Sequence, residues 1–359
     1  MKKGGIELYR FVMTNIVCLH HFRLYSEALP YGGGYLAVDF FFILSGYLLC
    51  RHYKKTDLLE GKSPFCKTIR YIKERYIRLF PQYLSVLLIS VILTVQIVEI
   101  KWSSENVFAF LLKFFMLDCF APGVQISIMP QGWYCSSLLI ASALMYYLYS
   151  KNEKIFKKIF APSFSIGIYL VFLLKYGHLN LYTQYGYIVT IGTFRAIAGL
   201  CLGSLLENFL GDRTIWPIKG KIINWSIFLA ATVYLLYALL WDNGYDKGDL
   251  LVLLFFVIVL LYLLGDTDVS AFFSTPFFEK LGEMSYTMFL IHYTIAVFFS
   301  HFGWGRSYDW KIVSILYLLL VFMCSKIVII AEKKMRLLCL KKSSISVERQ
   351  MLEEKQRQK

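Results

Sequence analysis

Long apolar runs dominate the pattern of hydrophobic and polar positions along this chain. Runs of roughly 17 to 22 residues recur throughout, each long enough to cross a hydrocarbon core of about 30 Å as an α-helix. They lack the period-two alternation of lipid-facing β-strands, which excludes a closed β-barrel. The pattern predicts an all-α, polytopic integral membrane protein with about ten transmembrane helices. The predicted spans are residues 6–26, 34–53, 79–100, 131–150, 160–176, 188–206, 222–241, 249–265, 285–302 and 312–331.

The positions of lysine and arginine predict the orientation of these spans. With the N-terminus in the cytoplasm, about 28 of these residues fall in cytoplasmic segments and about 7 outside, so we expect both termini to be cytoplasmic. The most basic segments are 51–78, predicted to be a loop, and the end of the chain from Lys333. The net charge of +14 follows from this topology and does not indicate a nucleic-acid partner. The composition agrees, with 57% hydrophobic residues and a mean hydropathy of +0.55.

The chain has no Pro-, Gly- or Ser-rich hinge that would divide it into several domains. We expect one membrane domain over residues 1–331 and a polar cytoplasmic tail over 332–359. The segment 101–130 is too long for a simple outer turn, and its apolar middle is expected to lie along the interface or to dip into the membrane and return. The eight cysteines are scattered without a C-x-x-C pair, so no metal site is expected.

Ionisable side chains inside the predicted spans are candidate functional groups, because a charge at membrane depth is costly and usually faces the bundle interior. Arg10 and His21 of the first span are eleven residues apart, which places them within about 20° of the same helix face. His21 lies about 16 Å beyond Arg10 along the helix, toward the outer side. We therefore expect one interior stripe to run from Arg10 through Thr14 and Val17 to His21.

The carboxylate of Asp39 stands inside the apolar sequence GYLAVDFFFILSGYLLC, near the outer end of the second span. Asp39 and His21 each lie about five residues from that end, and a short loop joins their helices, so we expect the two side chains to meet. Asp39 would then orient His21 as a general base toward a hydroxyl group. The alternative for Asp39 is a structural role in a buried network, or as a protonated carboxyl group.

Four stretches carry a resemblance to a known family. The first is Arg10 and His21 with ten residues between them, and the second is GGYLAVDFFFILSGYLL. The third is ERYIRLFPQYL, which contains Arg75 and Arg78, and the fourth is LGEMSYTMFLIHY. In this order they resemble acyltransferase family three, the integral-membrane acyltransferases of bacterial surface polysaccharides, peptidoglycan, lipid-linked sugars and some secondary metabolites. The chain is similar to the compact branch, because PQGWYCSSLLIASALMYYLY lacks the acidic residue that larger members carry after it and no fused soluble domain is evident.

The resemblance implies acyl-CoA, usually acetyl-CoA, as co-substrate, and no permanently bound cofactor. Arg10, Arg75 and Arg78 would then bind the donor, since arginine forks at the mouth of the third span suit phosphate oxygens. The alternative for Arg75 and Arg78 is an ordinary role as positive-inside anchors. An extended pantetheine arm would present its thioester near His21. His21 would either remove the proton from an acceptor hydroxyl or be acylated itself.

The candidate substrate-binding residues are Arg195, Trp133, Ser285, Tyr286 and His292. His292 lies seven residues and about 10 Å beyond Ser285 on the same face, so it would line the cavity, although a satisfied buried histidine is equally consistent. Arg195 has no obvious partner in its own helix and is expected to face the cavity or to pair with a buried acid such as Asp39. Trp133 and Tyr134, near an outer boundary, are either sugar platforms or aromatic-belt anchors.

We therefore expect an O-acyltransferase of the bacterial cytoplasmic membrane, surrounded by membrane lipids. It would move an acyl group, usually acetyl with succinyl as the alternative, from cytoplasmic acyl-CoA to a hydroxyl of a cell-surface or lipid-linked glycan. A flippase for lipid-linked sugars is the alternative function, although repeated halves and paired broken helices are not evident. A sensor or structural membrane protein would not need the arginine and histidine spacing. The identity of the acceptor and the oligomeric state stay open.

Overall fold

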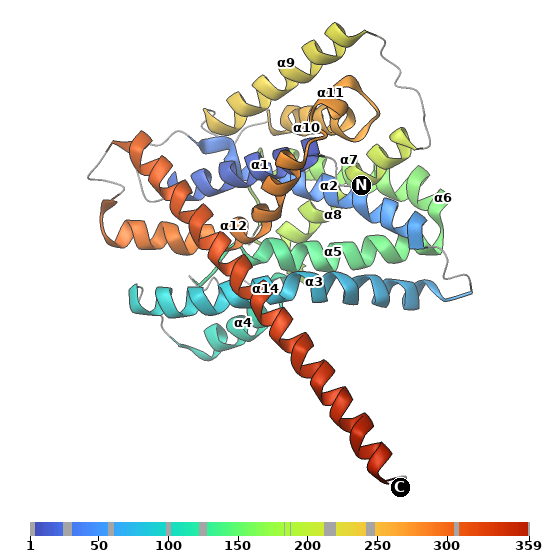
Figure 1. The fold of residues 1–359 in the computed structure, drawn as a ribbon. Coiled ribbons are helices and arrows are strands. Elements are labelled where there is room, and N and C mark those ends of the chain that lie inside the picture. Colours follow the sequence, from blue (N-terminus) through green and yellow to red (C-terminus); the bar gives the residue numbers. More distant parts are fainter. Residues whose placement is uncertain are drawn as a thin grey trace.

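A computed structural model describes residues 4–23, 31–56, 61–97, 102–121, 128–182, 184–186, 188–211, 220–241, 248–304 and 309–357. Each of the ten apolar segments overlaps a helix in this structure (Figure 1). The main helices are α1 (Gly4–Phe22), α2 (Ala37–Thr56), α3 (Pro64–Ile97), α5 (Gly132–Lys151), α7 (Ala161–Tyr176), α8 (Ile191–Leu210), α9 (Lys221–Leu240), α10 (Asp249–Leu264), α12 (Pro276–His301) and α14 (Trp310–Arg357). Shorter elements are η2 (Gly32–Leu36), α4 (Ser104–Phe114), η3 (Asp118–Phe120), α6 (Glu153–Ile155), the π-helical turn η4 (Phe156–Phe160) and α11 (Asp268–Phe272).

Some helices are apolar over a membrane-crossing length, and others carry buried polar groups that shorten their apolar runs. Within the described residues, five helical segments are long and apolar enough to cross a membrane: Gly32–Thr56, Pro64–Ile97, Glu153–Tyr176, Lys221–Leu240 and Trp310–Lys334. Helices α1, α5, α8 and α12 are not among these five, and they carry buried polar residues such as Thr14, Ser137, Arg195 and His292. The fold is that of an all-α membrane protein, whereas the count of ten spans and the cytoplasmic position of both termini stay predictions.

Large hydrophobic side chains cover the outside of the bundle. Leu174 on α7, Ile222 on α9 and Ile327 on α14 are 78%, 82% and 64% exposed. A soluble protein would bury most of such residues, while a lipid-facing helix presents them outward. The exposed apolar faces of these helices therefore fit a hydrocarbon environment.

Two helix pairs form the centre of the bundle. Helix α1 packs along α12, and α2 packs along α8. Close approach of α2 and α8 depends on glycine, because a Cβ atom at Gly46 would meet the backbone of Leu200 and one at Gly203 would meet the carbonyl of Ile43. Helices α3 and α5 pack together on one side of this centre, and α14 crosses α12 and α3 (Figure 1).

The segment between α2 and α3 is shorter than predicted. Residues 51–78 were expected to form a cytoplasmic loop, but α2 continues to Thr56 and α3 begins at Pro64. The apolar run ends before each helix does, because lysine, arginine and glutamate are good helix formers that favour water over lipid. Arg75 and Arg78 therefore lie within α3, where a regular helix fixes their direction.

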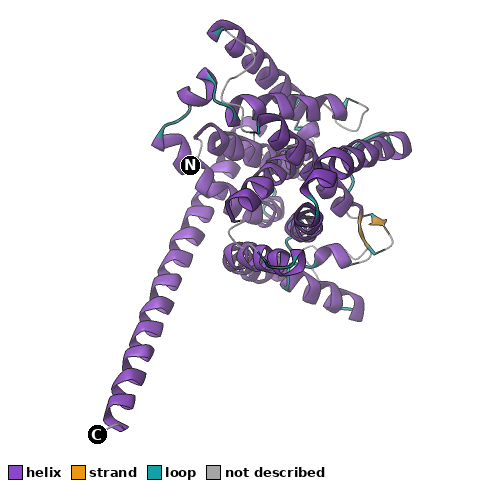
Figure 2. Cartoon of the chain, turned by 90° about the vertical axis from the view of Figure 1, so that its right-hand side faces the viewer, coloured by secondary structure: helices purple, strands orange, loops and turns teal. Residues whose placement is uncertain are grey.

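Three other segments add to the predicted outline. The apolar middle of 101–130 includes α4, whose N-terminus is capped by the Ser103 side chain accepting from the Asn106 amide. A two-residue hairpin, β1 (Tyr185–Gly186) with β2 (Val189–Thr190), lies at the edge of the bundle (Figure 2). Helix α14 continues past residue 331 without a break and projects from the bundle (Figures 1 and 2), and the domain boundary at 331 stays a prediction.

Candidate active site

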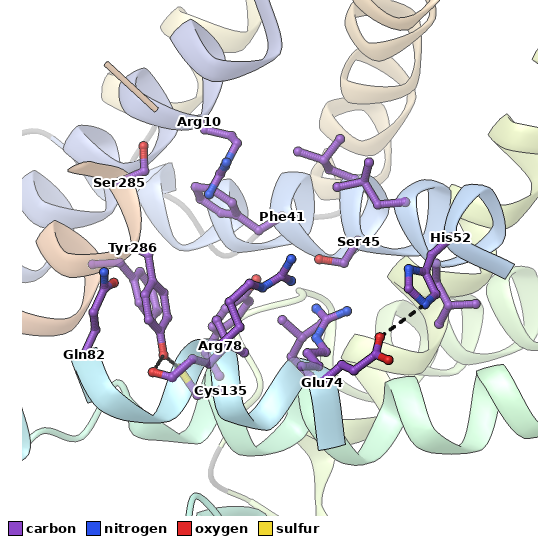
Figure 3. A pocket seen from close by; sticks show the side chains of 18 of the residues that line it. Arg10, Phe41, Ser45, His52, Glu74, Arg78, Gln82, Cys135, Ser285 and Tyr286 are labelled. Carbon is purple, nitrogen blue, oxygen red and sulfur yellow. Dashed lines mark hydrogen bonds and ion pairs between the residues drawn. The ribbon is translucent and has the colours of Figure 1, made fainter. Parts of the chain in front are cut away.

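A cavity of about 760 Å³ opens between helices α1, α2, α3, α5 and α12. The walls combine charged, hydrogen-bonding and aromatic side chains (Figure 3). The lining includes the polar, charged and aromatic residues Arg10, Thr14, Ser45, Arg51, His52, Lys55, Tyr71, Glu74, Arg75, Arg78, Gln82, Tyr134, Cys135, Ser285, Tyr286 and Phe289. Because the contributing helices come from both halves of the sequence, the cavity forms only when the bundle is assembled.

Positive charge dominates the lining of the cavity. It contains five permanently charged cations and one carboxylate, namely Arg10, Arg51, Lys55, Arg75 and Arg78 against Glu74. The carboxylate is already engaged, since it binds Arg70 at 2.9 Å and lies 3.9 Å from the His52 ring nitrogen. The remaining positive charge suits a ligand with several anionic groups.

The three arginines predicted to bind the donor meet at this cavity. In Figure 3, Arg10 from α1 and Arg78 from α3 point into the same space from opposite sides. Arg75 donates to the Tyr71 hydroxyl at 2.7 Å and its buried Nε has no hydrogen-bond partner, while Arg78 makes no hydrogen bond or ion pair with another described residue. Arg10 is held by Glu7 at 2.8 Å. Arg75 and Arg78 therefore retain donors for an anion.

Hydroxyl and aromatic side chains form the wall of the cavity at α12. Thr14 lies against α12 there, with its hydroxyl 3.4 Å from the Ser285 carbonyl. The Ser285 hydroxyl is buried without a hydrogen-bond partner among the described residues. The Tyr286 hydroxyl donates to the Leu79 carbonyl at 3.3 Å, and the Phe289 ring completes this wall. Both residues of the Ser-Tyr motif thus face the cavity, as predicted.

His21 and His292 lie two helical turns beyond Thr14 and Ser285, and neither is part of the cavity lining that was predicted for His292. The two rings are 4.9 Å apart between centroids, and the Phe289 ring lies 5.8 Å from His292. The Nδ1 atom of His21 lies 3.0 Å from the Val17 carbonyl, which can only accept, so Nδ1 carries the hydrogen and Nε2 carries a lone pair. His21 is half-buried, whereas His292 is fully buried. His21 therefore presents a nitrogen that can take a proton.

The predicted contact between Asp39 and His21 is wrong. Asp39 is fully buried and forms an ion pair with Arg195, whose Nη2 lies 2.5 Å from Oδ2 and whose Nε lies 3.2 Å from both oxygens. The Tyr169 hydroxyl donates to the same carboxylate at 3.3 Å. Matched depth was insufficient because His20, one position earlier on α1, faces η2 and the start of α2, while His21 faces α12.

Arg195 and Trp133 do not line the cavity. Arg195 is 1% exposed and its Nη2 also donates to the Tyr35 carbonyl at 2.9 Å, so of the two predicted alternatives the pairing with Asp39 is confirmed. Trp133 packs on Tyr182 and lies against Gly192, at the start of α8. Its neighbour Tyr134 lines the cavity instead. Substrate binding by Arg195 or Trp133 has no geometric support here.

Several cavity residues escaped the sequence interpretation. They are Ser45, His52, Glu74, Gln82 and Cys135. One signal was present: Tyr71, Arg75, Arg78 and Gln82 follow the four, three, four spacing of a single helix face. That pattern appears only if α3 is taken to begin before the apolar run, and the expected loop concealed it.

The fold and the cavity define a helical membrane protein with a positively charged cavity and, two helical turns beyond Thr14 and Ser285, a histidine pair. A family model described as an acyltransferase domain matches residues 4–331 of the 359-residue chain. The chain belongs to acyltransferase family three. Comparisons with curated proteins and with solved structures find no match.

Proposed function

We propose that this membrane acyltransferase moves an acetyl group from acetyl-CoA to a hydroxyl of a cell-surface or lipid-linked glycan. The observation that carries the proposal is the arrangement of charged and titratable groups along α1 and α12. Cations line the cavity together with Ser285 and Phe289, and the pair of His21 and His292 lies two helical turns beyond Thr14 and Ser285, with the His292 ring 5.8 Å from Phe289.

The cationic part of the cavity supports a donor with phosphate groups. Coenzyme A carries a diphosphate and a phosphate monoester, which are bound by guanidinium forks and ammonium groups. Arg75, Arg78, Arg51 and Lys55 supply these donors from two helices. We assign Arg75 and Arg78 the principal phosphate contacts, because both keep free donors and are fixed by α3.

The distance to the histidine pair suits a long, thin arm. Arg10 and His21 are separated by eleven residues of one helix, about 16 Å. A pantetheine arm bound between α1 and α12 would pass Thr14 and Ser285 on this route. The Ser285 hydroxyl, which lacks a partner in the described structure, is a suitable donor to the amide or thioester oxygen of the arm.

His21 acts as general base in this mechanism. The Nε2 lone pair removes the proton of the acceptor hydroxyl while its oxygen attacks the thioester carbonyl. The new C–O bond replaces the C–S bond, and the proton neutralises the departing thiolate of coenzyme A. Asp39 takes no part in this step, because its oxygens are bound by Arg195 and Tyr169.

We place this reaction in the bacterial cytoplasmic membrane, with lipids against the exposed apolar faces of the outer helices. The test is release of free thiol from acetyl-CoA by the full-length protein in liposomes, with candidate glycans added as acceptors. His21→Ala should lower turnover about 100-fold or more while acetyl-CoA still binds. The matched control is His301→Ala, at the exposed end of α12. Unchanged turnover in His21→Ala would refute the mechanism, and absence of turnover with every acceptor would refute the donor assignment.

A further inference from the structure

His21 and His292 share one bonding pattern that leaves the same nitrogen of each ring as an acceptor. In His292, Nδ1 lies 2.6 Å from the Phe289 carbonyl, so the hydrogen resides on Nδ1, as it does in His21. The Nε2 atom of His292 is buried and has no hydrogen-bond partner in the described part of the chain. A buried acceptor without a donor is unfavourable, and the molecule retains one beside its candidate base.

The helices hold the two rings in matching positions. His21 follows Thr14 by seven residues on α1, and His292 follows Ser285 by seven residues on α12, which is about 10 Å along each helix. Thr14 contacts the Ser285 carbonyl. Seven residues further along both helices the two imidazoles lie together, with an interplanar angle of 53°. Two parallel helices in register thus bring the histidines together.

The surroundings of the pair contain other titratable groups but no ion pair. The His20 ring lies 5.3 Å from His21, with its own Nδ1 on the Tyr31 carbonyl, and the Tyr293 ring lies 6.0 Å from His21. From α14, the Tyr317 hydroxyl donates to the His292 carbonyl at 3.0 Å. Among the described residues, no carboxylate forms an ion pair with either imidazole of the pair. A positive charge on His21 therefore has to be stabilised by a neutral neighbour.

We propose that His21 and His292 hold one proton as a pair during acyl transfer, with His292 as the positioning residue that accepts a hydrogen bond from protonated His21. With both rings neutral, two lone pairs share the site and no hydrogen joins them. One added proton converts them into a charge-assisted hydrogen bond. This inference rests on the proposed transfer from acyl-CoA to a hydroxyl group.

The proposed step conserves the proton that it moves. The O–H bond of the acceptor breaks and its proton passes to His21, while the acceptor oxygen forms a bond to the acyl carbon. The C–S bond then breaks with its electron pair on sulfur, and the shared proton leaves the pair to form the S–H bond of coenzyme A. His292 contacts neither substrate in this scheme and acts only through His21.

The first test measures protonation of His21 without requiring turnover. Diethyl pyrocarbonate modifies only neutral imidazole, so the pH dependence of His21 modification, followed by peptide mass spectrometry on the full-length protein in liposomes, gives a protonation midpoint. His292→Phe should lower this midpoint by about one pH unit, the equivalent of a tenfold change in proton affinity. His292→Gln, whose amide oxygen still accepts, should lie between Phe and wild type. Equal midpoints in all three proteins would overturn the proposal.

The second test measures thiol release from acetyl-CoA by the same proteins. His292→Phe should reduce kcat about 10-fold to 100-fold with little change in KM for acetyl-CoA, and His292→Gln should recover part of the loss. Equal losses in Phe and Gln, with acetyl-CoA binding intact, would show a packing role and refute the pair. If the midpoints shift but wild type releases no thiol, the proton pair stands and the proposed donor fails. If thiol is released but the midpoints coincide, the reverse holds.

Discussion

Replacing Asp39 and Arg195 together should be less harmful than replacing either residue alone. Each side chain is almost fully buried, and three contacts of 2.5 to 3.2 Å join the two. Removal of one partner leaves an uncompensated charge inside the bundle, which costs about 3–5 kcal/mol. Asp39→Leu and Arg195→Met should therefore each strongly lower the thermal stability of the purified protein.

The double variant Asp39→Leu/Arg195→Met contains no buried charge at this position. What it loses is the partner of the Tyr35 carbonyl and of the Tyr169 hydroxyl, at about 1–3 kcal/mol each. Each single variant loses one of these hydrogen bonds as well, so it should cost about 4–8 kcal/mol in all, against about 2–6 kcal/mol for the double variant. The difference is a favourable coupling between the two replacements.

The assay is fluorescence-detected size-exclusion chromatography after heating, combined with thiol release from acetyl-CoA. The double variant should melt above both single variants and should recover turnover with it, since Asp39 contributes to folding and not to proton transfer. Additive losses of stability would refute the ion pair. A double variant that is stable but inactive would instead indicate that Asp39 takes part in proton transfer by His21.

Further predictions address the cavity, the helix packing and the segment that includes α4. Arg78→Gln should raise KM for acetyl-CoA about tenfold without lowering kcat, measured against Arg70→Gln, whose exposed guanidinium lies outside the cavity; equal effects would argue against phosphate binding. Gly46→Ala should sharply reduce the folded yield in detergent, because its Cβ would meet the backbone of α8, while Gly167→Ala, with open space around it, should behave as wild type. Lys113→Met should destabilise the protein by about 3 kcal/mol, because its carboxylate partner at 2.5 Å is buried with it; an unchanged melting temperature would contradict this.

The sequence predicted the parts of the site that depend on spacing within one helix. Arg10 and Thr14 line the cavity and His21 lies beyond them on the same helix, as the eleven-residue separation indicated. His292 also follows Ser285 along α12 as the seven-residue separation indicated, although it does not line the cavity. Such predictions succeed because rise and rotation per residue are fixed by backbone hydrogen bonding.

The sequence failed where the neighbour of a helix face had to be known. Asp39 has the depth of His21 but points to α8, and Trp133 lies one position from a cavity residue yet packs on Tyr182. One residue corresponds to a rotation of about 100° around the axis. Hydropathy gives the depth of a side chain, whereas packing between helices decides which partner it meets, and that requires the assembled bundle.

The distance between the arginines and the imidazole pair has a consequence for donor selection. In the proposed mechanism the cations hold the phosphate end of the donor, and His21 lies about 16 Å from Arg10 along α1, near half the thickness of the hydrocarbon core. The proposed site would therefore select its donor by length. A shortened donor that keeps every phosphate would bind as firmly as acetyl-CoA and still fail to react. Whether the thioester reaches His21 would depend on the geometry of α1 and α12. How tightly the donor binds would depend on the charges of α2 and α3.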